Sequence, residues 1–349
     1  MRNSISDPLK SVAADPPNLD TVDVANAVAE QFGLVGTYVA LVSERDQNFK
    51  LTTEAGDRYV VKIVCTAEET AVTDFQIAAL LHLEHKGFSG APRIVRTKSD
   101  RGRGAILADD GSMSCLRLVT WLPGALLAAR DTSENLATQL GHRLADLDLA
   151  LEDFDHEGDR QVLLWDIQRA GDLRKLSNHI GDREIRRRVV GVLDDFASCV
   201  SPALAGLCHQ VIHNDVNPDN VLLNDSGAVF AVIDFGDMMR APRVIELSTA
   251  ASYLRSENPL QYILPLITAY CSRNPLEERE VGHLYDLIRA RLAMTLTILF
   301  WRLSAREPGD PYREKSLAVE RDAYDFLVAL EALGREQVSD RLKESLLVS

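Results

Sequence analysis

The stretch over residues 211–237 constrains this chain more than any other part of its sequence. An apolar run leads into a polar turn that carries His213 and Asp215, and Asn220 follows five residues after Asp215. A second apolar run ends at Asp234 and is separated from the first by the sequence Asn-Asp-Ser-Gly. Those four residues predict a tight turn, so we expect a hairpin that brings Asn220 and Asp234 together.

These residue types in this order indicate a site for phosphoryl transfer. A carboxylate at Asp215 can orient an attacking hydroxyl group and take its proton, while Asn220 and Asp234 offer the hard oxygen ligands that Mg²⁺ prefers. The His-x-Asp-x4-Asn spacing alone is short, and its alternative interpretation is an acidic surface turn beside an ordinary hairpin. The Ile-Asp-Phe-Gly sequence fourteen residues after Asn220 makes phosphoryl transfer the stronger interpretation.

At these residues the chain resembles the aminoglycoside phosphotransferase family, which are small-molecule kinases with a protein-kinase-like fold. The sequences His-Asn-Asp-Val-Asn from His213 and Ile-Asp-Phe-Gly-Asp-Met from Ile233 are most similar to hydroxylysine kinase-like members. The resemblance implies an α+β, bilobal fold with a small antiparallel-sheet N-lobe and a larger helical C-lobe. We expect a disordered leader over 1–19, a nucleotide-binding lobe over 20–118, a hinge over 119–124, and a helical lobe with the catalytic loop and acceptor site over 125–349.

Charge and cysteine content limit the partners and the compartment. The chain has 38 Lys and Arg against 52 Asp and Glu, a formal charge of −14, which argues against a nucleic-acid or anionic-membrane partner and suits a cationic or zwitterionic acceptor. Five cysteines without Cys-x-x-Cys spacing are typical of reduced thiols. The first twenty residues lack an apolar signal sequence, and the apolar run over 292–301 is too short to span a bilayer. We expect a cytoplasmic enzyme.

Hydrophobic patterning predicts sheet first and helices later. Asp20 is a candidate N-cap and Gly33 a candidate C-terminal stop for the first helix. The expected elements are a helix over 20–33, strands over 37–42, 48–53 and 59–64, a helix over 68–83, strands over 91–95, 104–108 and 116–124, helices over 133–151 and 185–199, and a helix opening at 243.

Lys62 lies inside an apolar strand pattern, where a charged side chain needs a partner. The resemblance implies that it contacts the α- and β-phosphates of the nucleotide and a carboxylate on the following helix. The position of the expected glutamate is Gln76, so Asp74, Glu69 or Glu68 serves instead, or Gln76 hydrogen-bonds Lys62. The alternative is a solvent-facing lysine on an edge strand.

The turn over 43–49 stands where a kinase covers the nucleotide phosphates, yet it contains no glycine. The resemblance assigns a phosphate contact to Asn48, which precedes an aromatic residue as in the family, and Ser43 and Gln47 offer side-chain or backbone hydrogen bonds to phosphate. The alternative is a polar hairpin turn.

The resemblance also places the interlobe hinge at Thr120, Trp121 and Leu122, whose backbone groups would pair with the adenine edge. Trp121 either stacks nearby or packs in a core.

The acceptor side of the site is less sharply defined by the sequence. Trp165 and Asp166 follow a long helix in a loop, and the resemblance places acceptor contacts in this region. Asp237 is a group near the metal, a contact for an acceptor amine, or a turn residue. The resemblance further implies that His213 braces the catalytic loop and that Glu246 supports it.

The resemblance therefore implies an enzyme, an ATP- or GTP-dependent phosphotransferase that uses Mg²⁺. Its expected acceptor is a hydroxyl of a hydroxylated amino acid or amino alcohol such as hydroxylysine. Alternatives within the same chemistry are kinases of homoserine, of choline or ethanolamine, and of an aminoglycoside. A different class, a non-catalytic nucleotide-binding regulatory module, is favoured by the missing loop glycines and by Gln76 and disfavoured by the intact Asp215, Asn220 and Asp234.

Overall fold

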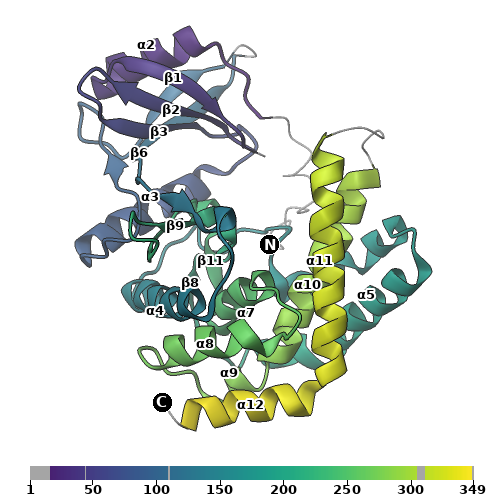
Figure 1. The fold of residues 1–349 in the computed structure, drawn as a ribbon. Helices are drawn as coiled ribbons and strands as arrows, with labels where there is room; N and C mark the ends of the chain where they lie inside the picture. Colours follow the sequence, from purple (N-terminus) through teal and green to yellow (C-terminus); the bar gives the residue numbers. More distant parts are fainter. Residues whose placement is uncertain (1–15, 44, 109–110, 305–310, 348–349) are drawn as a thin grey trace. The chain divides into compact units, whose positions relative to one another are not determined.

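The structure is a computed structural model that describes residues 16–43, 45–108, 111–304 and 311–347, with the backbone alone described over 311–318 (Figure 1). Most of the predicted leader, residues 1–15, and Glu44 of the predicted phosphate turn lie outside the described residues. The chain divides into two compact units. The first contains the residues up to Gly124 together with Phe154–Leu164, and the second contains Ala125–Asp153 and the chain from Trp165 onward.

An antiparallel sheet forms the centre of the first unit, in the order β1-β2-β3-β6-β4, with β5 also paired to β6. Helix α2 (Thr21–Phe32) covers one face of this sheet (Figure 1) and has the two ends predicted from the sequence. The Asp20 carboxylate accepts a hydrogen bond of 2.7 Å from the Val22 N–H, and Gly33 adopts a left-handed φ of 75°. The strands are β1 (Gly36–Leu41), β2 (Gln47–Thr53), β3 (Arg58–Ile63), β4 (Ile94–Val95), β5 (Gly104–Leu107) and β6 (Met113–Thr120).

Strand alternation separates a packed face from a polar face. Phe49, Val61 and Leu118 are buried against α2 in the core of this unit, which also includes Leu19 from the predicted leader. Residues one position away point to the other face of the sheet, and they include Lys62. One face of the sheet therefore packs against α2, and Lys62 lies on the opposite face.

Helix α3 (Thr70–His85) and the segment Phe154–Leu164 pack against each other. The rings of Phe75 and Phe154 stack with centroids 5.9 Å apart. A Cβ on Gly158 would fall 2.1 Å from the Ala71 carbonyl oxygen, so only glycine allows this close approach. These contacts explain why a segment that the sequence prediction included in the C-terminal lobe belongs with the first unit.

The second unit is mainly helical. It contains a three-stranded sheet in the order β10-β9-β7 and the antiparallel pair β8-β11. Helix α10 passes through its interior beside α7 and α11 (Figure 1). Pro265 lies inside α8. The elements are β7 (Ala125–Leu126), α4 (Glu134–Leu151), η2 (Ile167–His179), α5 (Arg183–Asp195), α6 (Ser201–Leu204), β8 (His209–Ile212), β9 (Val221–Leu223), β10 (Val229–Val232), β11 (Met239–Pro242), α7 (Val244–Tyr253), α8 (Leu260–Cys271), α9 (Glu278–Val281), α10 (Leu284–Ser304), α11 (Pro311–Leu333) and α12 (Arg335–Leu347).

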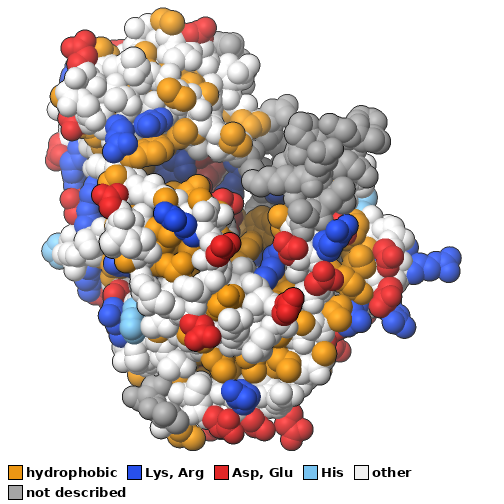
Figure 2. All heavy atoms as spheres, viewed as in Figure 1, with side chains coloured by type: hydrophobic (Ala, Val, Ile, Leu, Met, Phe, Trp, Pro, Cys, Tyr) orange, Lys and Arg blue, Asp and Glu red, His pale blue; other side chains and the backbone are white. Residues whose placement is uncertain are grey.

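The predicted fold class, α+β with an antiparallel-sheet unit and a larger helical unit, is confirmed. Figure 2 shows Lys and Arg side chains interspersed with Asp and Glu on the visible face. Among helices in the described part of the chain, none combines the length and the hydropathy that a membrane crossing requires.

Candidate active site

The loop that carries His213 and Asp215 begins where β8 ends, and β11 pairs with β8 in the register Met239↔Ile212. Asn214 takes a left-handed φ of 65°, which is uncommon for a residue with a side chain. Its N–H donates a hydrogen bond of 2.9 Å to Oε2 of Glu246, which is fully buried on α7. Burial raises the pKa of Glu246 to about 7, against the lowering effect of that hydrogen bond. Glu246 therefore fixes the backbone of the loop, as the resemblance implied.

His213 connects this loop to the one that carries Asp234. Its Nδ1 accepts a hydrogen bond of 3.3 Å from the Asp215 N–H, so the proton is on Nε2, which lies 3.0 Å from the Ile233 carbonyl oxygen. The ring is fully buried and packs edge-to-face against Phe235, with centroids 4.7 Å apart. Because burial lowers the pKa of His213 to about 4, the imidazole is neutral at pH 7. A neutral His213 acts as a brace with one donor and one acceptor.

Three side chains hold the Asp215 carboxylate. Oδ1 accepts 3.1 Å from Nδ2 of Asn217 and lies 3.6 Å from Nη2 of Arg291, while Oδ2 accepts 2.8 Å from Nδ2 of Asn220. Burial, followed by the charge of Asp237, raises the pKa of Asp215 to about 7, and Arg291 and Asn217 act against this rise. The side chain remains 25% exposed. Asp215 is therefore a positioned carboxylate that a hydroxyl group can reach.

The predicted hairpin forms and brings Asn220 and Asp234 together. Asn224 closes its turn by accepting hydrogen bonds from the N–H groups of Ser226 and Ala228, both at 3.0 Å. At the open end, the Ile233 N–H donates 2.9 Å to the Asn220 carbonyl oxygen. Asp234 follows directly, exposed and with a left-handed φ of 62°.

The oxygen atoms at this point fit a hard divalent cation. Both hydrogen bonds of the Asn220 side chain to Asp215 use Nδ2, one to a carboxylate oxygen and one to the backbone carbonyl, which turns Oδ1 away from Asp215. Asp234, the residue after Ile233, contributes a carboxylate at the same end of the hairpin. In the described part of the chain, no three His, Cys, Asp or Glu side chains are grouped to hold a metal ion. A site with two protein oxygens suits a metal such as Mg²⁺ that also binds nucleotide phosphates and water.

Lys62 lies in a polar row on the sheet of the first unit. Asn48 on β2 and Arg117 on β6 are its direct cross-strand neighbours, so the three side chains leave the same face. Arg117 is buried, and its charge lowers the pKa of Glu68 while burial, the larger effect, raises it. Sequence reasoning missed Arg117, although it interrupts an apolar strand pattern just as Lys62 does.

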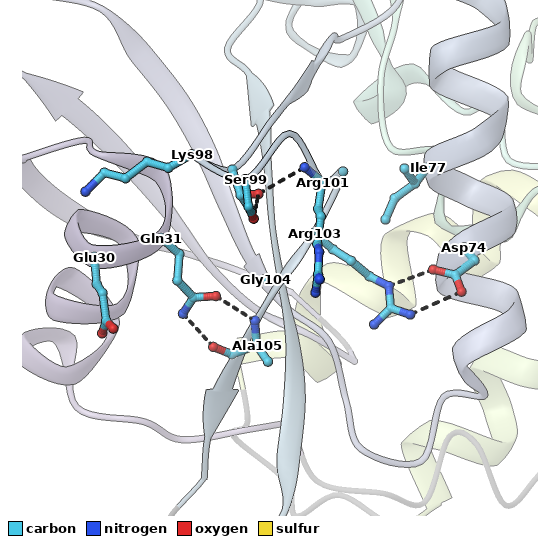
Figure 3. Close-up of a pocket in the computed structure, with 12 residues that line it drawn as sticks. Glu30, Gln31, Asp74, Ile77, Lys98, Ser99, Arg101, Arg103, Gly104 and Ala105 are labelled. Carbon is cyan, nitrogen blue, oxygen red and sulfur yellow. Dashed lines mark hydrogen bonds and ion pairs between the residues drawn. The ribbon is translucent and has the colours of Figure 1, made fainter.

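The candidate partners of Lys62 on α3 differ in their surroundings. Asp74 forms an ion pair with Arg103 through two hydrogen bonds of 2.6 and 3.2 Å (Figure 3). Glu68, just before the helix, accepts 2.6 Å from the Thr73 hydroxyl. Gln76 is buried. Asp74 is therefore paired with Arg103, so Glu68 and Glu69 are the stronger carboxylate candidates for the partner of Lys62.

Asp74 also borders a hollow of about 710 Å³ in the first unit, shown in Figure 3. Gln31 on α2 forms two hydrogen bonds with the backbone of Ala105 there, at 2.7 and 2.9 Å. Apart from Asp74, none of the predicted site residues lines this hollow.

The predicted phosphate turn and hinge are partly engaged within the first unit. The Ser43 hydroxyl accepts 3.3 Å from the Asp46 N–H and so closes its turn. The Thr120 N–H donates to the Arg93 carbonyl, and the Trp121 N–H donates to a carbonyl of β3. The N–H groups of Thr120 and Trp121 therefore form hydrogen bonds within the first unit. Of the predicted hinge N–H groups, that of Leu122 stays the candidate for an adenine contact.

On the acceptor side, Asp166 has a structural contact. Its buried carboxylate accepts 2.9 Å from the Gln168 N–H and caps η2, and burial raises its pKa to about 6. The half-buried ring of Trp165 lies 4.8 Å from the Arg291 guanidinium carbon, and the Trp165 carbonyl accepts 2.8 Å from Nη1 of Arg291. Of the two predicted residues, Trp165 is the one linked to Asp215 through Arg291.

Arg291 is the main site residue that sequence reasoning missed. It is fully buried on α10, and its guanidinium carbon also lies 5.9 Å from the centroid of the Tyr253 ring. The available signal was an arginine directly before the apolar run over 292–301, because a charge beside such a run needs a buried partner.

Comparisons with known proteins agree with this geometry. The model of the phosphotransferase enzyme family matches residues 38–285. Hydroxylysine kinase of Danio rerio is 25% identical over 351 residues, which cover 96% of this chain and 98% of that protein. Hydroxylysine kinase of Bos taurus is 26% identical over 364 residues, with 97% and 96% covered.

Solved structures show the same fold. An amicoumacin kinase in complex with AMP-PNP, Ca²⁺ and Ami aligns with a TM-score of 0.68 at 16% identity, over 89% of this chain and 94% of that one. A microcompartment-associated aminopropanol kinase aligns with a TM-score of 0.64 at 14% identity, over 91% and 99%. Because the family model matches most of the sequence, including every residue of the catalytic loop, this chain belongs to the phosphotransferase enzyme family and is a small-molecule kinase.

Proposed function

We propose that the enzyme transfers the γ-phosphoryl group of a nucleoside triphosphate to the hydroxyl group of a hydroxylated amino acid, with hydroxylysine as the first candidate. The observation that carries this proposal is the Asp215 carboxylate, fixed by Asn217, Asn220 and Arg291 beside Asp234. The names of the curated relatives support hydroxylysine over choline, ethanolamine or an aminoglycoside.

Each residue has a distinct role in the proposed reaction. Asp215 orients the acceptor hydroxyl and takes its proton as the oxygen attacks the γ-phosphorus and the bond to the leaving nucleoside diphosphate breaks. Lys62 contacts the phosphates, and His213 keeps the two loops in register. Asn220 and Asp234 hold Mg²⁺, which supplies neutralisation of phosphate charge when bound. Binding geometry and electrostatics, more than proton transfer, account for the rate.

The donor is ATP or GTP, and the metal is Mg²⁺. The AMP-PNP and Ca²⁺ bound to the structural relative support a nucleotide with a divalent cation. We further propose a cytoplasmic enzyme with a zwitterionic acceptor and without a nucleic-acid or membrane partner, on the basis of the charge of −14 and five cysteines outside disulfides.

The test is release of nucleoside diphosphate from ATP and from GTP with 5-hydroxylysine, homoserine, choline, ethanolamine and an aminoglycoside. We expect turnover with hydroxylysine that is lost in Asp215→Ala by about 10³-fold or more. Asp219→Ala is the matched control, because Asp219 is an exposed carboxylate four residues away. Turnover that survives in Asp215→Ala would contradict the proposed base. Nucleotide binding without turnover on any acceptor would favour the regulatory module.

A further inference from the structure

Helix α4 contributes a buried carboxyl group, Asp148, beside the strand that leads into the catalytic loop. Asp148 is fully buried, and α4 packs against α7, α8 and β8 in the second unit (Figure 1). Its backbone carbonyl accepts a hydrogen bond of 2.9 Å from Nε2 of Gln210, which lies on β8. Asp148 therefore belongs to the framework of the loop rather than to the surface that an acceptor can reach.

A chain of hydrogen bonds connects this carboxyl group to Arg243, and each bond in it has a fixed direction. The Arg243 guanidinium has only donors, and its Nη1 donates 2.7 Å to Oδ1 of Asn274. The Asn274 side chain therefore presents its Nδ2 to the Tyr270 hydroxyl, at 3.0 Å. Because that hydroxyl accepts from Asn274, it donates its own proton to Oδ2 of Asp148, 2.6 Å away. Oδ2 of Asp148 is therefore an acceptor.

Two carboxyl groups on the neighbouring helices α4 and α7 each have one oxygen without a partner. In the described part of the chain, Oδ1 of Asp148 and Oε1 of Glu246 are both buried and accept no hydrogen bond. The charges of the two groups act on each other, because burial and then the charge of Glu246 raise the pKa of Asp148 well above its ordinary value. Two buried carboxylates close together are unfavourable, whereas one proton held by the pair turns one of them into a donor.

The surroundings of the pair decide which carboxyl group holds this proton. Burial raises the pKa of Glu246 to about 7, and the N–H groups of His213 and Asn214 oppose this rise because they favour its charged form. For Asp148, burial and the charge of Glu246 outweigh the opposing effects of the Tyr270 hydroxyl and of the arginine charge. Above pH 7, Asp148 is therefore the carboxylic acid of the pair and Glu246 the carboxylate. Since Oδ2 of Asp148 accepts from Tyr270, its proton is on Oδ1.

We propose that Asp148 is a positioning residue for phosphoryl transfer, which donates a hydrogen bond from its protonated Oδ1 to Oε1 of Glu246. With Oε1 held in this way, Oε2 of Glu246 stays in place to accept from the Asn214 N–H at 2.9 Å. Asn214 directly precedes Asp215 and has a left-handed φ of 65°, a conformation that needs support from its surroundings. The hydrogen-bond chain that begins at Arg243 therefore ends at the backbone of the proposed base.

The experiment uses the fact that asparagine reproduces a protonated aspartic acid but not an aspartate. In Asp148→Asn the amide oxygen can accept from Tyr270, and Nδ2 can donate to Glu246. Asp148→Leu has the same branching and no polar atom. We would measure kcat and both KM values at pH 8 with the acceptor that wild type uses. Asp148→Leu should lower kcat by about tenfold to a hundredfold with little change in KM, and Asp148→Asn should restore kcat to within about threefold of wild type.

Two controls separate positioning from a general loss of stability. Leu144→Ala removes a fully buried side chain one helical turn earlier on α4, and it should lower the melting temperature while kcat of the folded enzyme is unchanged. A double-mutant cycle tests whether Asp148 acts through Glu246. In the Glu246→Gln background the effect of Asp148→Leu on kcat should be at least about threefold smaller, because a neutral amide suffers less than a buried carboxylate from the loss of a donor.

An infrared spectrum tests the proton itself and needs no turnover. The C=O stretch of a protonated carboxyl group is separate from the bands of a carboxylate. At pH 8 the wild type should show a protonated carboxyl band that Asp148→Asn lacks and that Leu144→Ala keeps.

The inference rests on the proposed function for the role of Asp215, but not on which hydroxyl compound is the acceptor. Equal losses of kcat in Asp148→Asn and Asp148→Leu would mean that a charged Asp148 is required, and they refute the inference while the kinase assignment stands. An unchanged kcat in Asp148→Leu, independent effects in the double-mutant cycle, or an infrared band that persists in Asp148→Asn refute it too. A wild type without turnover on any acceptor contradicts the proposed function, and the infrared band then decides by itself whether Asp148 holds the proton.

Discussion

Replacement of Glu246 by glutamine should flatten the dependence of stability on pH. Glu246 is fully buried, and its Oε2 accepts a hydrogen bond of 2.9 Å from the Asn214 N–H. The side-chain oxygen of a glutamine can accept the same hydrogen bond. The glutamine carries no charge at any pH. Glu246→Gln therefore keeps the support of the catalytic loop and removes one titrating group.

The sign and size of the effect follow from the pKa of Glu246, which burial raises from 4.5 to about 7. Between these values the unfolded chain has lost the proton and the folded chain keeps it, so the folded state binds more protons. Stability therefore falls as pH rises through this interval and does not change further above it. At roughly 1.4 kcal/mol for each pKa unit, the rise in the pKa of Glu246 lowers the free energy of unfolding by about 3 kcal/mol over this pH interval.

Urea unfolding of both proteins at pH 5 and pH 8 measures this effect. The free energy of unfolding of wild type relative to Glu246→Gln should fall by about 2 to 3 kcal/mol from the lower to the higher pH. Buried carboxyls that do not interact with Glu246 titrate alike in both proteins, so their contribution cancels in the difference. Glu246→Ala serves as a second variant, because it leaves the buried Asn214 N–H without its acceptor and should be about 1 to 3 kcal/mol less stable than Glu246→Gln at either pH. A pH-independent difference between wild type and Glu246→Gln would refute the reasoning.

Two further perturbations test the metal site and the packing of the first unit. Asp234→Asn should remove one ionic metal ligand and lower kcat by about 10²- to 10⁴-fold across a Mg²⁺ titration. Asp225→Asn changes an exposed turn residue of the same hairpin and should leave kcat unchanged. Full activity of Asp234→Asn at saturating Mg²⁺ would contradict the assignment of Asp234 as a metal ligand. Gly158→Ala should lower the stability by about 1 to 3 kcal/mol in thermal unfolding, because its Cβ would fall 2.1 Å from the Ala71 carbonyl oxygen; an unchanged melting temperature would show that the segment can shift at no cost.

Local signals in the sequence predicted the parts of the site that depend on neighbouring residues. The turn at Asn224 fixes the hairpin within about a dozen residues, so the proximity of Asn220 and Asp234 could be predicted. The caps at Asp20 and Gly33 likewise defined α2, because both act within one turn of the helix.

Contacts between distant parts of the sequence could not be predicted in this way. Arg291 meets the Trp165 carbonyl across 126 residues, and no pattern in either segment specifies that pairing. Asp166 was assigned to the acceptor by its position after a helix, whereas its carboxylate caps the following turn. A single sequence shows that a buried charge needs a partner but does not identify the partner.

The packing of Phe154–Leu164 on α3 has a consequence for how the protein is made. The chain leaves the first unit after Gly124, builds α4 of the second unit, and returns before it leaves again at Trp165. During synthesis the first unit therefore lacks one of its own layers until about forty residues beyond its main boundary have emerged, by which time part of the second unit has been made. A fragment that ends at Gly124 would expose the Phe75 side of α3, so a soluble version of the first unit has to include residues up to 164.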